Sequence, residues 1–344
     1  MRRIAIVGAG VAGLAAAWSL RRSGRNVVVF EKSRGLSGRA ATRRRNGKCY
    51  DHGANFFRTD DPEVAELVHR VLPTGDLVEI PGEVWTFGAD GKPSAGDPVL
   101  NARPKHSYRQ GISMLGKLLA EAAEPEVRRE TRVGRMERAG GRWRVFDDAE
   151  GELAECSAVV MTPPAPQSAT VLEASTFDPD LRGALCDALS RTTYEQQFSF
   201  ILGFGCEWAR GGPFHALVNL DRGHDVTWIS FENDKPGHVP GGETVLIVQM
   251  SAGWSAEHYD VPRAGLVPEV VERVRRILPG MPEPGWWDVQ RWAFARPTRA
   301  VDVDVLRTAE QEGLYFAGDA LFGRGRIPLA IKSGLEAARH LADR

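Results

Sequence analysis

The chain has few cysteines, 4 in 344 residues, and they are widely separated (Cys49, Cys156, Cys186 and Cys206). No C-x-x-C pair occurs, so the sequence predicts neither a zinc site nor a redox-active disulfide. The 8 histidines show no metal-ligand spacing either, and we expect no metal. The formal net charge is only −1, which argues against nucleic acid or an anionic membrane as a partner.

Long apolar runs are also missing. No segment approaches the roughly twenty residues that span a bilayer, and the N-terminus lacks the features of a secretory signal. We therefore expect a cytoplasmic protein without a membrane partner. The hydrophobic fraction of 42% is enough for a substantial core, and the length is typical of two domains.

The strongest pattern lies at the start of the chain. A short apolar run, residues 4–7, leads into Gly8-Ala-Gly10-Val-Ala-Gly13, then a helical stretch, then a second apolar run that ends at Glu31. Gly8 permits a tight turn, Gly10 lets the backbone approach a pyrophosphate, and Gly13 lets the helix pack closely on the sheet. The helix N-terminus attracts the phosphates, and Glu31 can accept hydrogen bonds from ribose hydroxyls. This order of features predicts dinucleotide binding.

The next segment indicates which dinucleotide. Residues 31–42 run Glu31-Lys32, then Ser37-Gly38-Arg39, and they resemble the Glu-Lys-x-x-x-x-Gly-Gly-Arg motif of FAD-dependent amine oxidase-like proteins, with Ser37 in place of the first glycine of the Gly-Gly pair. The resemblance implies FAD, with the loop wrapped around its pyrophosphate. The segment Tyr50–Phe57 is similar to the family's x-Asp-x-Gly-Ala-x-x-Phe sequence, where the chain passes the flavin; it would place Gly53, Ala54 and Asn55 at the cofactor. A position such as Val133 pairs with the adenine edge in this family.

A second motif lies near the C-terminus. A predicted strand ends in Gly318-Asp319, and a loop and a helix from about Ile327-Pro328 follow. In the resembling family the aspartate holds a ribityl hydroxyl, and this helix points its N-terminus at the flavin pyrimidine, where it stabilises the negative charge of the reduced ring. No cysteine lies nearby, so non-covalent FAD is expected.

The middle of the chain has a different character. Runs rich in β-branched and aromatic residues between 194 and 297 predict an antiparallel sheet, and helices are expected at 61–72, 108–123, 178–190 and 262–278. The predicted fold is α/β, with a Rossmann-type FAD-binding domain made of residues 1–57, 105–165 and 299–344. A discontinuous α+β substrate domain, built on the antiparallel sheet, comprises residues 58–104 and 166–298.

The size and the segment Gln290-Arg-Trp292-Ala-Phe-Ala-Arg296-Pro are most similar to the bacterial renalase-like branch of the family. That resemblance implies a hydride donor that is small and planar, exemplified by dihydro-NAD(P) isomers, with O2 as acceptor. Trp292, Arg296 and His52 are the candidate catalytic residues: the indole would stack on a flat substrate, and the guanidinium would meet a phosphate or carboxylate.

The alternative for each candidate is a structural role: Trp292 as an aromatic residue of the core, Arg296 as an ion-pair partner and His52 as a structural histidine. Many amine oxidases carry a lysine on a substrate-domain strand, whereas the run 194–204 has none. An amine oxidase, a desaturase and an FAD-binding protein without turnover remain the alternatives. The basic run Arg43–Arg45 reads either as a solvated surface or as a phosphate-binding patch. The oligomeric state stays open.

Overall fold

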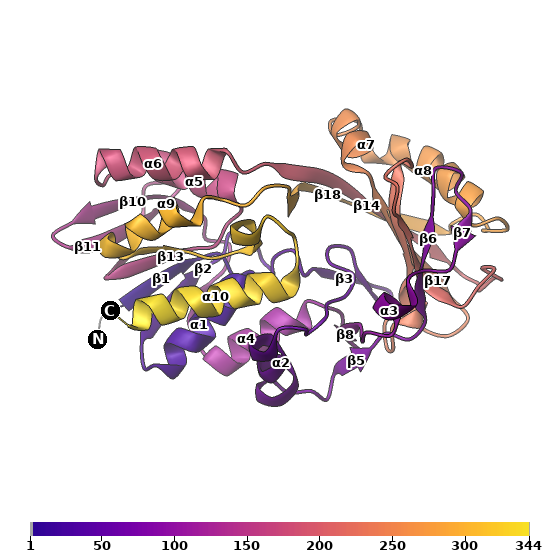
Figure 1. The fold of residues 1–344 in the computed structure, drawn as a ribbon, viewed down its shortest axis with the longest axis horizontal. Coiled ribbons are helices and arrows are strands. Elements are labelled where there is room, and N and C mark those ends of the chain that lie inside the picture. The colour runs from indigo at the N-terminus through magenta and orange to yellow at the C-terminus, as the bar shows by residue number, and fades with distance from the viewer. Residues whose placement is uncertain (1–2, 344) are drawn as a thin grey trace.

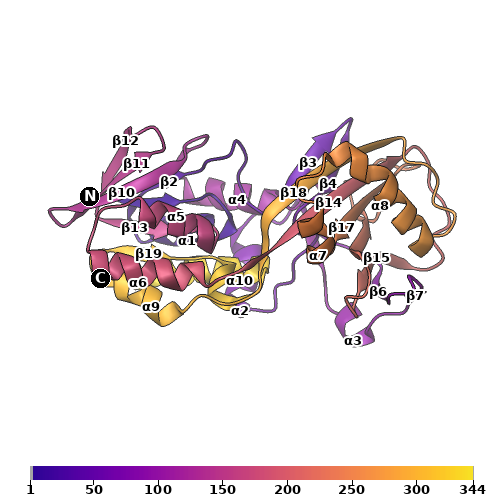
Figure 2. The ribbon, with the colours of Figure 1, turned by 90° about the horizontal axis from the view of Figure 1, so that it is seen from above.

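The computed structural model describes residues 3–343. Its elements form two main sheets at opposite ends of an elongated molecule, and two long strands, β14 (Tyr194–Phe204) and β18 (Trp286–Pro297), run between them (Figures 1 and 2). Each sheet has its own layers of helices and its own core.

The first sheet is parallel throughout. Its strands lie in the order β19 (Leu314–Phe316), β13 (Ala158–Met161), β1 (Arg3–Val7), β2 (Asn26–Phe30), β9 (Glu126–Arg128). These strands are nearly continuous apolar runs because both of their faces are covered. One face packs on α1 (Val11–Arg22), α4 (Met114–Ala123) and α10 (Ile327–Ala342). The other packs on α5 (Ala165–Glu173), α6 (Pro179–Ser190), α9 (Val303–Thr308) and the small sheet β10 (Val133–Ala139), β11 (Arg142–Asp147), β12 (Glu152–Cys156).

The second sheet has the order β18, β14, β17 (Thr244–Met250), β16 (Val226–Phe231), β15 (Phe214–Asn219), β6 (Glu83–Phe87), β7 (Pro93–Ser94). The strands between 194 and 297 are antiparallel, as the sequence predicts, but β6 joins β15 in parallel. Helices α7 (Ala252–Glu257) and α8 (Arg263–Ile277) cover one face (Figure 1). The other face turns toward the segment 50–57, as the contacts of Tyr50 with this sheet show.

Several predicted elements differ in detail. The helix expected over 61–72 is the α-helical turn α2 (Pro62–Glu66) followed by a π-helical turn, Leu67–Val71. Residues 106–108 form strand β8 (His106–Tyr108), paired with β5 (Leu77–Glu79), so the helix predicted to begin at Tyr108 begins at Met114. The basic run lies in the hairpin β3 (Thr42–Arg45), β4 (Lys48–Asp51). A short helix, α3 (Pro98–Asn101), completes the elements.

The α/β fold with a parallel Rossmann-type sheet and a separate antiparallel-rich sheet is thus confirmed. We keep the two-domain division as a proposal with one change. Helices α5 and α6 pack in the same core as β2 and β13, so we propose to assign residues 166–193 to the FAD-binding domain.

Candidate functional site

The cofactor residues predicted from the sequence gather at one edge of the parallel sheet. Strand β1 ends just before Gly8, β2 ends before Glu31, and β19 ends before Gly318-Asp319. The carboxyl ends of parallel strands share one edge, and ligands of such sheets bind in the crevice where the strand order reverses. Here β1 lies between β2 on one side and β13 on the other, which makes its end such a point.

The glycine turn has the close contacts that its spacing predicts. Gly8 has φ +100°, a conformation that L side chains rarely adopt. A Cβ on Gly13 would lie 2.1 Å from the carbonyl oxygen of Gly8, so the helix can approach the strand only with glycine there. The helix begins after Gly10, which offers no side-chain cap, so the first backbone N–H groups of α1 keep no side-chain partner.

Two charged residues of the predicted cofactor set, Glu31 and Arg39, form hydrogen bonds with other groups of the protein. Glu31 is buried and accepts hydrogen bonds at 2.8 Å from the N–H groups of Ala9 and Ser33. Arg39 donates to Asp319 Oδ1 at 2.5 Å and to the carbonyl of Ala295 at 3.0 Å. The N-terminal and C-terminal motifs, 280 residues apart, therefore meet directly.

The remaining cofactor candidates lie around the same region. Gly38 faces Gly10, whose Cα would lie 3.1 Å from a Cβ placed on Gly38. Lys32 donates to Gln167 Oε1 at 2.9 Å, and burial lowers its pKa. Val133 is buried at the start of β10. Ile327 and Pro328 open α10, and the N-cap Arg326 makes no side-chain capping bond there.

The segment 53–55 lies between the two sheets. A Cβ on Gly53 would lie 2.1 Å from the carbonyl oxygen of Arg39, and Ala54 N–H donates to that same oxygen at 3.0 Å. From the other side, Gln249 on β17 donates to the Gly53 carbonyl at 2.9 Å. Ser230 on β16 donates to Asn55 Oδ1 at 3.0 Å. The backbone that would pass the flavin is thus fixed to both halves of the molecule.

Two of the three catalytic candidates come together. The His52 ring stacks on Trp292, with ring centroids 5.5 Å apart and planes 14° apart, and Trp292 Nε1 donates to the His52 carbonyl at 3.1 Å. Burial, followed by the charge of Arg43, lowers the pKa of His52 to about 4, so its ring is neutral at pH 7. Arg296 is separate from this pair: it forms an ion pair with Glu195 on the neighbouring strand β14 at 2.6 Å.

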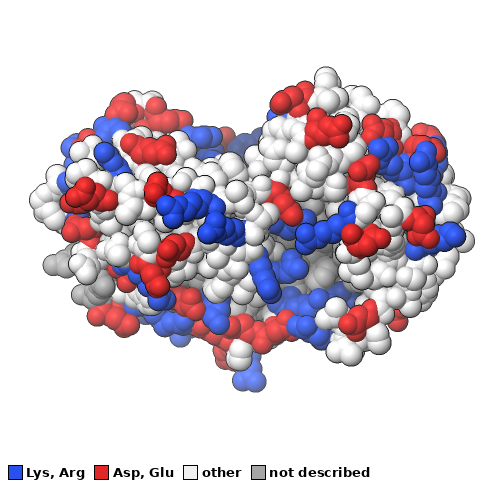
Figure 3. Space-filling view, turned by 45° about the horizontal axis from the view of Figure 1, so that its top comes forward, with Lys and Arg blue, Asp and Glu red and all other residues white. Residues whose placement is uncertain are grey.

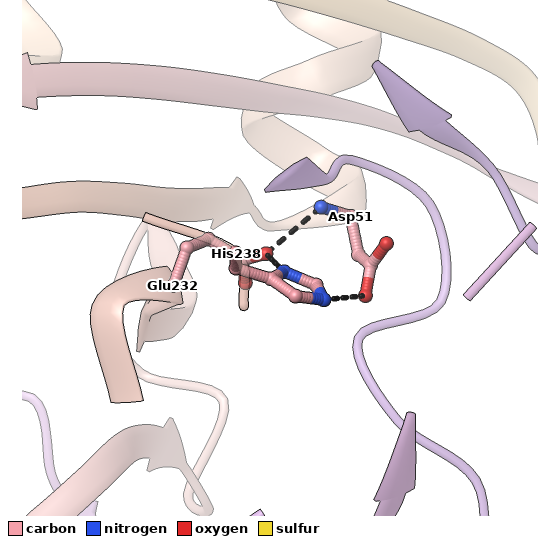
Figure 4. A group of neighbouring side chains, drawn as sticks. All are labelled: Asp51, Glu232 and His238. Atoms are coloured by element: carbon pink, nitrogen blue, oxygen red, sulfur yellow. Dashed lines mark hydrogen bonds and ion pairs between the residues drawn. The ribbon is translucent and has the colours of Figure 1, made fainter. Parts of the chain in front are cut away.

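Next to this segment lies a buried charge cluster that the sequence interpretation missed (Figure 4). Lys235 binds Asp51 Oδ2 at 3.0 Å and Glu232 Oε1 at 2.8 Å, and all three side chains are fully buried. His238 completes the group, with Nδ1 2.9 Å from Glu232 Oε2 and Nε2 2.9 Å from the carbonyl of Tyr108. We call these four residues the buried charge cluster.

The charges in this cluster balance. Although burial lowers the pKa of His238, hydrogen bonds to Cys49 and Glu232 and the charge of Asp51 raise it to about 10, so the ring is an imidazolium that donates from both nitrogens. Asp51, Glu232 and His238 bring ligand atoms within 4.8 Å of one another, a spacing that suits a metal ion. The Lys235 ammonium binds both carboxylates instead, so their charge needs no metal to balance it.

The basic run Arg43–Arg45 contacts β18. Arg43 binds Asp288 Oδ2 at 2.7 Å and Gln290 Oε1 at 2.6 Å. The guanidinium of Arg45 lies 4.8 Å from the centre of the Trp286 ring. Arg44 donates to the carbonyl of Gln110 at 2.6 Å. All three arginines thus have partners within the protein, which does not favour a phosphate patch there.

The comparison with known families decides the class of protein. The profile of a NAD(P)-binding Rossmann-like domain matches residues 6–71, and that of the flavin containing amine oxidoreductases matches residues 81–342. The chain belongs to the flavin-containing amine oxidoreductase family. It is therefore an FAD-dependent oxidoreductase that acts on a small molecule, and the prediction of non-covalent FAD is confirmed.

Individual relatives within this family differ in how much they match. Renalase of Mus musculus is 23% identical over 88% of this chain and 87% of its own length. Protoporphyrinogen oxidase 2 of Arabidopsis thaliana is 45% identical over 67 residues, which cover 20% of this chain and only 13% of the plant enzyme. Among solved structures, cyclohexylamine oxidase from Brevibacterium oxydans IH-35A has a TM-score of 0.76 at 15% identity, covering 99% of both chains. This likeness shows the shared fold.

The described site fits FAD. Gly8 and Gly13 leave no room for side chains, α1 and α10 begin without side-chain caps, and the motif residues meet at one sheet edge. We propose that the predicted residues hold the cofactor: the glycine turn and Glu31 at the adenosine end, Arg39 and Asp319 in the middle, and the segment 53–55 with the α10 N-terminus at the flavin. Among residues 3–343, no helix is both long and apolar enough to cross a bilayer.

Sequence reasoning missed Glu232, Lys235, His238, Ser230 and Gln249. The only signal for the first three was their spacing of three residues directly after a buried strand, β16. Ser230 and Gln249 gave no signal, because polar residues that alternate along a strand are expected on any half-solvated sheet.

Proposed function

We propose that this enzyme oxidises a small planar hydride donor of the dihydropyridine type, such as an isomer of dihydro-NAD(P), and passes the electrons to O2. The observation that carries the proposal is the second sheet: its seven strands, all within the described residues, contain no lysine. Lys235 and Lys105 lie near this sheet but outside its strands: Lys235 is fully buried in ion pairs, and Lys105 precedes β8. The strands therefore offer no counterpart of the substrate-domain strand lysine that the resemblance associates with amine oxidation.

A dihydropyridine needs no such group. Its ring C–H bond breaks, both electrons leave with the hydrogen as hydride, and the ring becomes an aromatic pyridinium without losing a proton. FAD, when bound, would supply the two-electron acceptor for this hydride, and its reoxidation by O2 would consume one proton from solvent and give hydrogen peroxide. The protein has to orient the donor, and the neutral His52 ring stacked on Trp292 forms a flat aromatic wall beside Gly53 that suits a planar ring.

The similarity to renalase over most of both chains supports this choice. The test is an anaerobic donor screen on the FAD-loaded protein. Dihydro-NAD(P) isomers should bleach the flavin absorbance rapidly, and readmitted O2 should restore it with one hydrogen peroxide per donor. If amines or polyenes bleach the flavin and the dihydropyridines do not, the proposal is wrong, and an amine oxidase or a desaturase replaces it.

A further inference from the structure

Beyond Asn55, the chain enters a region where buried polar groups lack partners. Both ring nitrogens of His215 on β15 are buried without a hydrogen bond, and the side chain is 1% exposed. The indole N–H of Trp228 on the adjacent strand β16 is also buried and unpaired, as is Nε of Arg58. Native proteins pair nearly all such groups, so each unpaired one needs an explanation.

These side chains gather around the ring of Phe56. The His215 ring centre lies 6.5 Å from that of Phe56, and the Trp228 ring centre lies 5.9 Å from it. The guanidinium of Arg58 lies 5.2 Å from the same ring centre. Phe56 directly follows Asn55, which Ser230 binds from the same sheet. The group therefore adjoins the backbone that we assign to the flavin.

Lys105 adds a second positive charge. Phe57 and His106 form an antiparallel bridge, which places Arg58 directly opposite Lys105 on the same face. Lys105 is 4% exposed, and among residues 3–343 its ammonium group makes no hydrogen bond or ion pair. Like charges placed opposite each other in a strand pair destabilise the fold.

No carboxylate offsets these two charges at close range. The charges of Glu79 and Glu83 act on Lys105 and that of Asp60 acts on Arg58, but no carboxylate lies within 4.0 Å of either cation in the described chain. Burial, and then the charges of Lys235 and Lys105, lower the pKa of His215 to about 3. Its neutral ring still offers one N–H donor. Phe56, Arg58 and Trp228 are half-buried, so this group of donors is open on one side.

We propose that Arg58, Lys105, His215 and Trp228 form an oxyanion-binding part of the substrate site, which holds a phosphate or carboxylate of the hydride donor. Four groups that donate hydrogen bonds, and two positive charges without an ion-pair partner among the described residues, match an oxyanion and repel a protonated amine. The half-buried aromatic rings between them suit the planar part of the same molecule. Figure 3 shows Lys and Arg side chains gathered in the hollow between the two lobes, which gives an anion a positively charged approach.

The identity of the hydride donor rests on the proposed function, but the first test of the oxyanion site does not depend on that donor. Inorganic pyrophosphate is titrated calorimetrically into the FAD-loaded protein. The wild type should bind it, and Lys105→Met and Arg58→Met should each weaken binding at least tenfold. Lys92→Met and Arg70→Met, on the exposed surface, are the matched controls and should leave it unchanged. If the wild type and all four variants bind pyrophosphate with equal affinity, the anion is an adventitious ion only, and the proposal is overturned.

A second readout excludes a merely structural role. Lys105→Met removes a cation without an ion-pair partner and keeps the apolar part of a largely buried side chain, so its melting temperature should equal or exceed that of the wild type while anion binding falls. A lower melting temperature together with unchanged pyrophosphate binding would show that Lys105 serves the fold and not the ligand.

A third readout connects the site to turnover. Flavin reduction is measured with a dihydronicotinamide riboside, which lacks phosphate, and with its mononucleotide. The mononucleotide should bind at least tenfold more tightly to the wild type, and Lys105→Met should remove this difference. If neither donor reduces the flavin while pyrophosphate still binds, the proposed function fails and the oxyanion site stands. If both donors bind equally to the wild type, the site does not serve this substrate.

Discussion

The glycine turn can bind a dinucleotide only because residue 13 has no Cβ atom. The Cβ of an alanine at position 13 would lie 2.1 Å from the Gly8 carbonyl oxygen, which is backbone and cannot rotate away. Gly13→Ala should therefore cost about 1–3 kcal/mol of folding free energy and weaken FAD binding at least tenfold, about 1.4 kcal/mol. Flavin fluorescence titration and urea unfolding measure the two effects.

The control is a glycine in a helix with free space around it. A Cβ on Gly183 in α6 would meet nothing within 4 Å. Gly183→Ala should therefore stabilise the protein by about 0.5–1 kcal/mol and leave FAD binding unchanged. Equal FAD affinity in both variants would contradict the role of Gly13.

His238 should impose a pH dependence on stability. Its pKa in the folded protein is raised to about 10 from the ordinary value of 6.5. The stabilisation it provides is therefore complete below about pH 6.5 and disappears as the pH rises through 10. Unfolding free energies measured across this range should fall for the wild type and change less for His238→Gln. Parallel curves would show that His238 does not carry the effect.

At the scale of elements, the buried charge cluster joins strand β4 to the turn after β16. Asp51 ends β4, and its carboxylate also accepts bonds from Thr42, Ser107 and the backbone of Ile112. Its pKa falls despite burial because Lys235 and His238 lie beside it. The cluster thus fixes the backbone immediately before His52 and Gly53, and we infer that it positions the segment predicted to contact the flavin.

Removing the central cation should leave two buried carboxylates with one imidazolium. Lys235→Met should cost about 3–5 kcal/mol, because an unpaired buried charge is strongly destabilising. Adding Asp51→Asn to this variant should restore part of the loss, since one carboxylate then balances His238. Urea unfolding of the two single variants and the double variant gives the coupling energy, and strict additivity would exclude the direct pairing of Lys235 with Asp51.

At the scale of the whole molecule, the cofactor residues come from both ends of the chain. Gly8 and Asp319 follow different strands of one sheet, β1 and β19, and Arg39 of the N-terminal motif forms an ion pair with Asp319. A ligand that contacts both regions binds only the folded protein and must raise its stability. At an FAD concentration one hundred times the dissociation constant, the unfolding free energy should increase by about 2.7 kcal/mol.

Thermal unfolding of the apoprotein at increasing FAD concentrations measures this effect. FMN, which lacks the adenosine half, should give a much smaller shift at equal concentration because the glycine turn and Glu31 would have no partner. Equal shifts with the two flavins would contradict the assignment of the glycine turn to the adenosine end.

Much of this architecture follows from local patterns. The strand, the glycine turn, the helix and Glu31 could be predicted because adjacent residues form them, and the Gly318-Asp319 motif is equally local. The later start of α4 could not, because the pairing of Tyr108 with Leu77 overrides the helical pattern of the same residues. Helix α5 was not predicted because its apolar residues follow directly on the proline stop after β13.

The sequence by itself determined the dinucleotide-binding turn and the two kinds of sheet, since motif spacing and hydrophobic periodicity are properties of the chain alone. The resemblance of its motifs to a known family implied FAD. Only the tertiary structure decided what surrounds the site. It paired Arg296 with Glu195, enclosed Lys235 between two carboxylates, and placed Arg58 opposite Lys105 beside the unpaired nitrogens of His215. The physical reason is that the effect of a charge depends on its burial and its partners, and these are set by residues far apart in the chain.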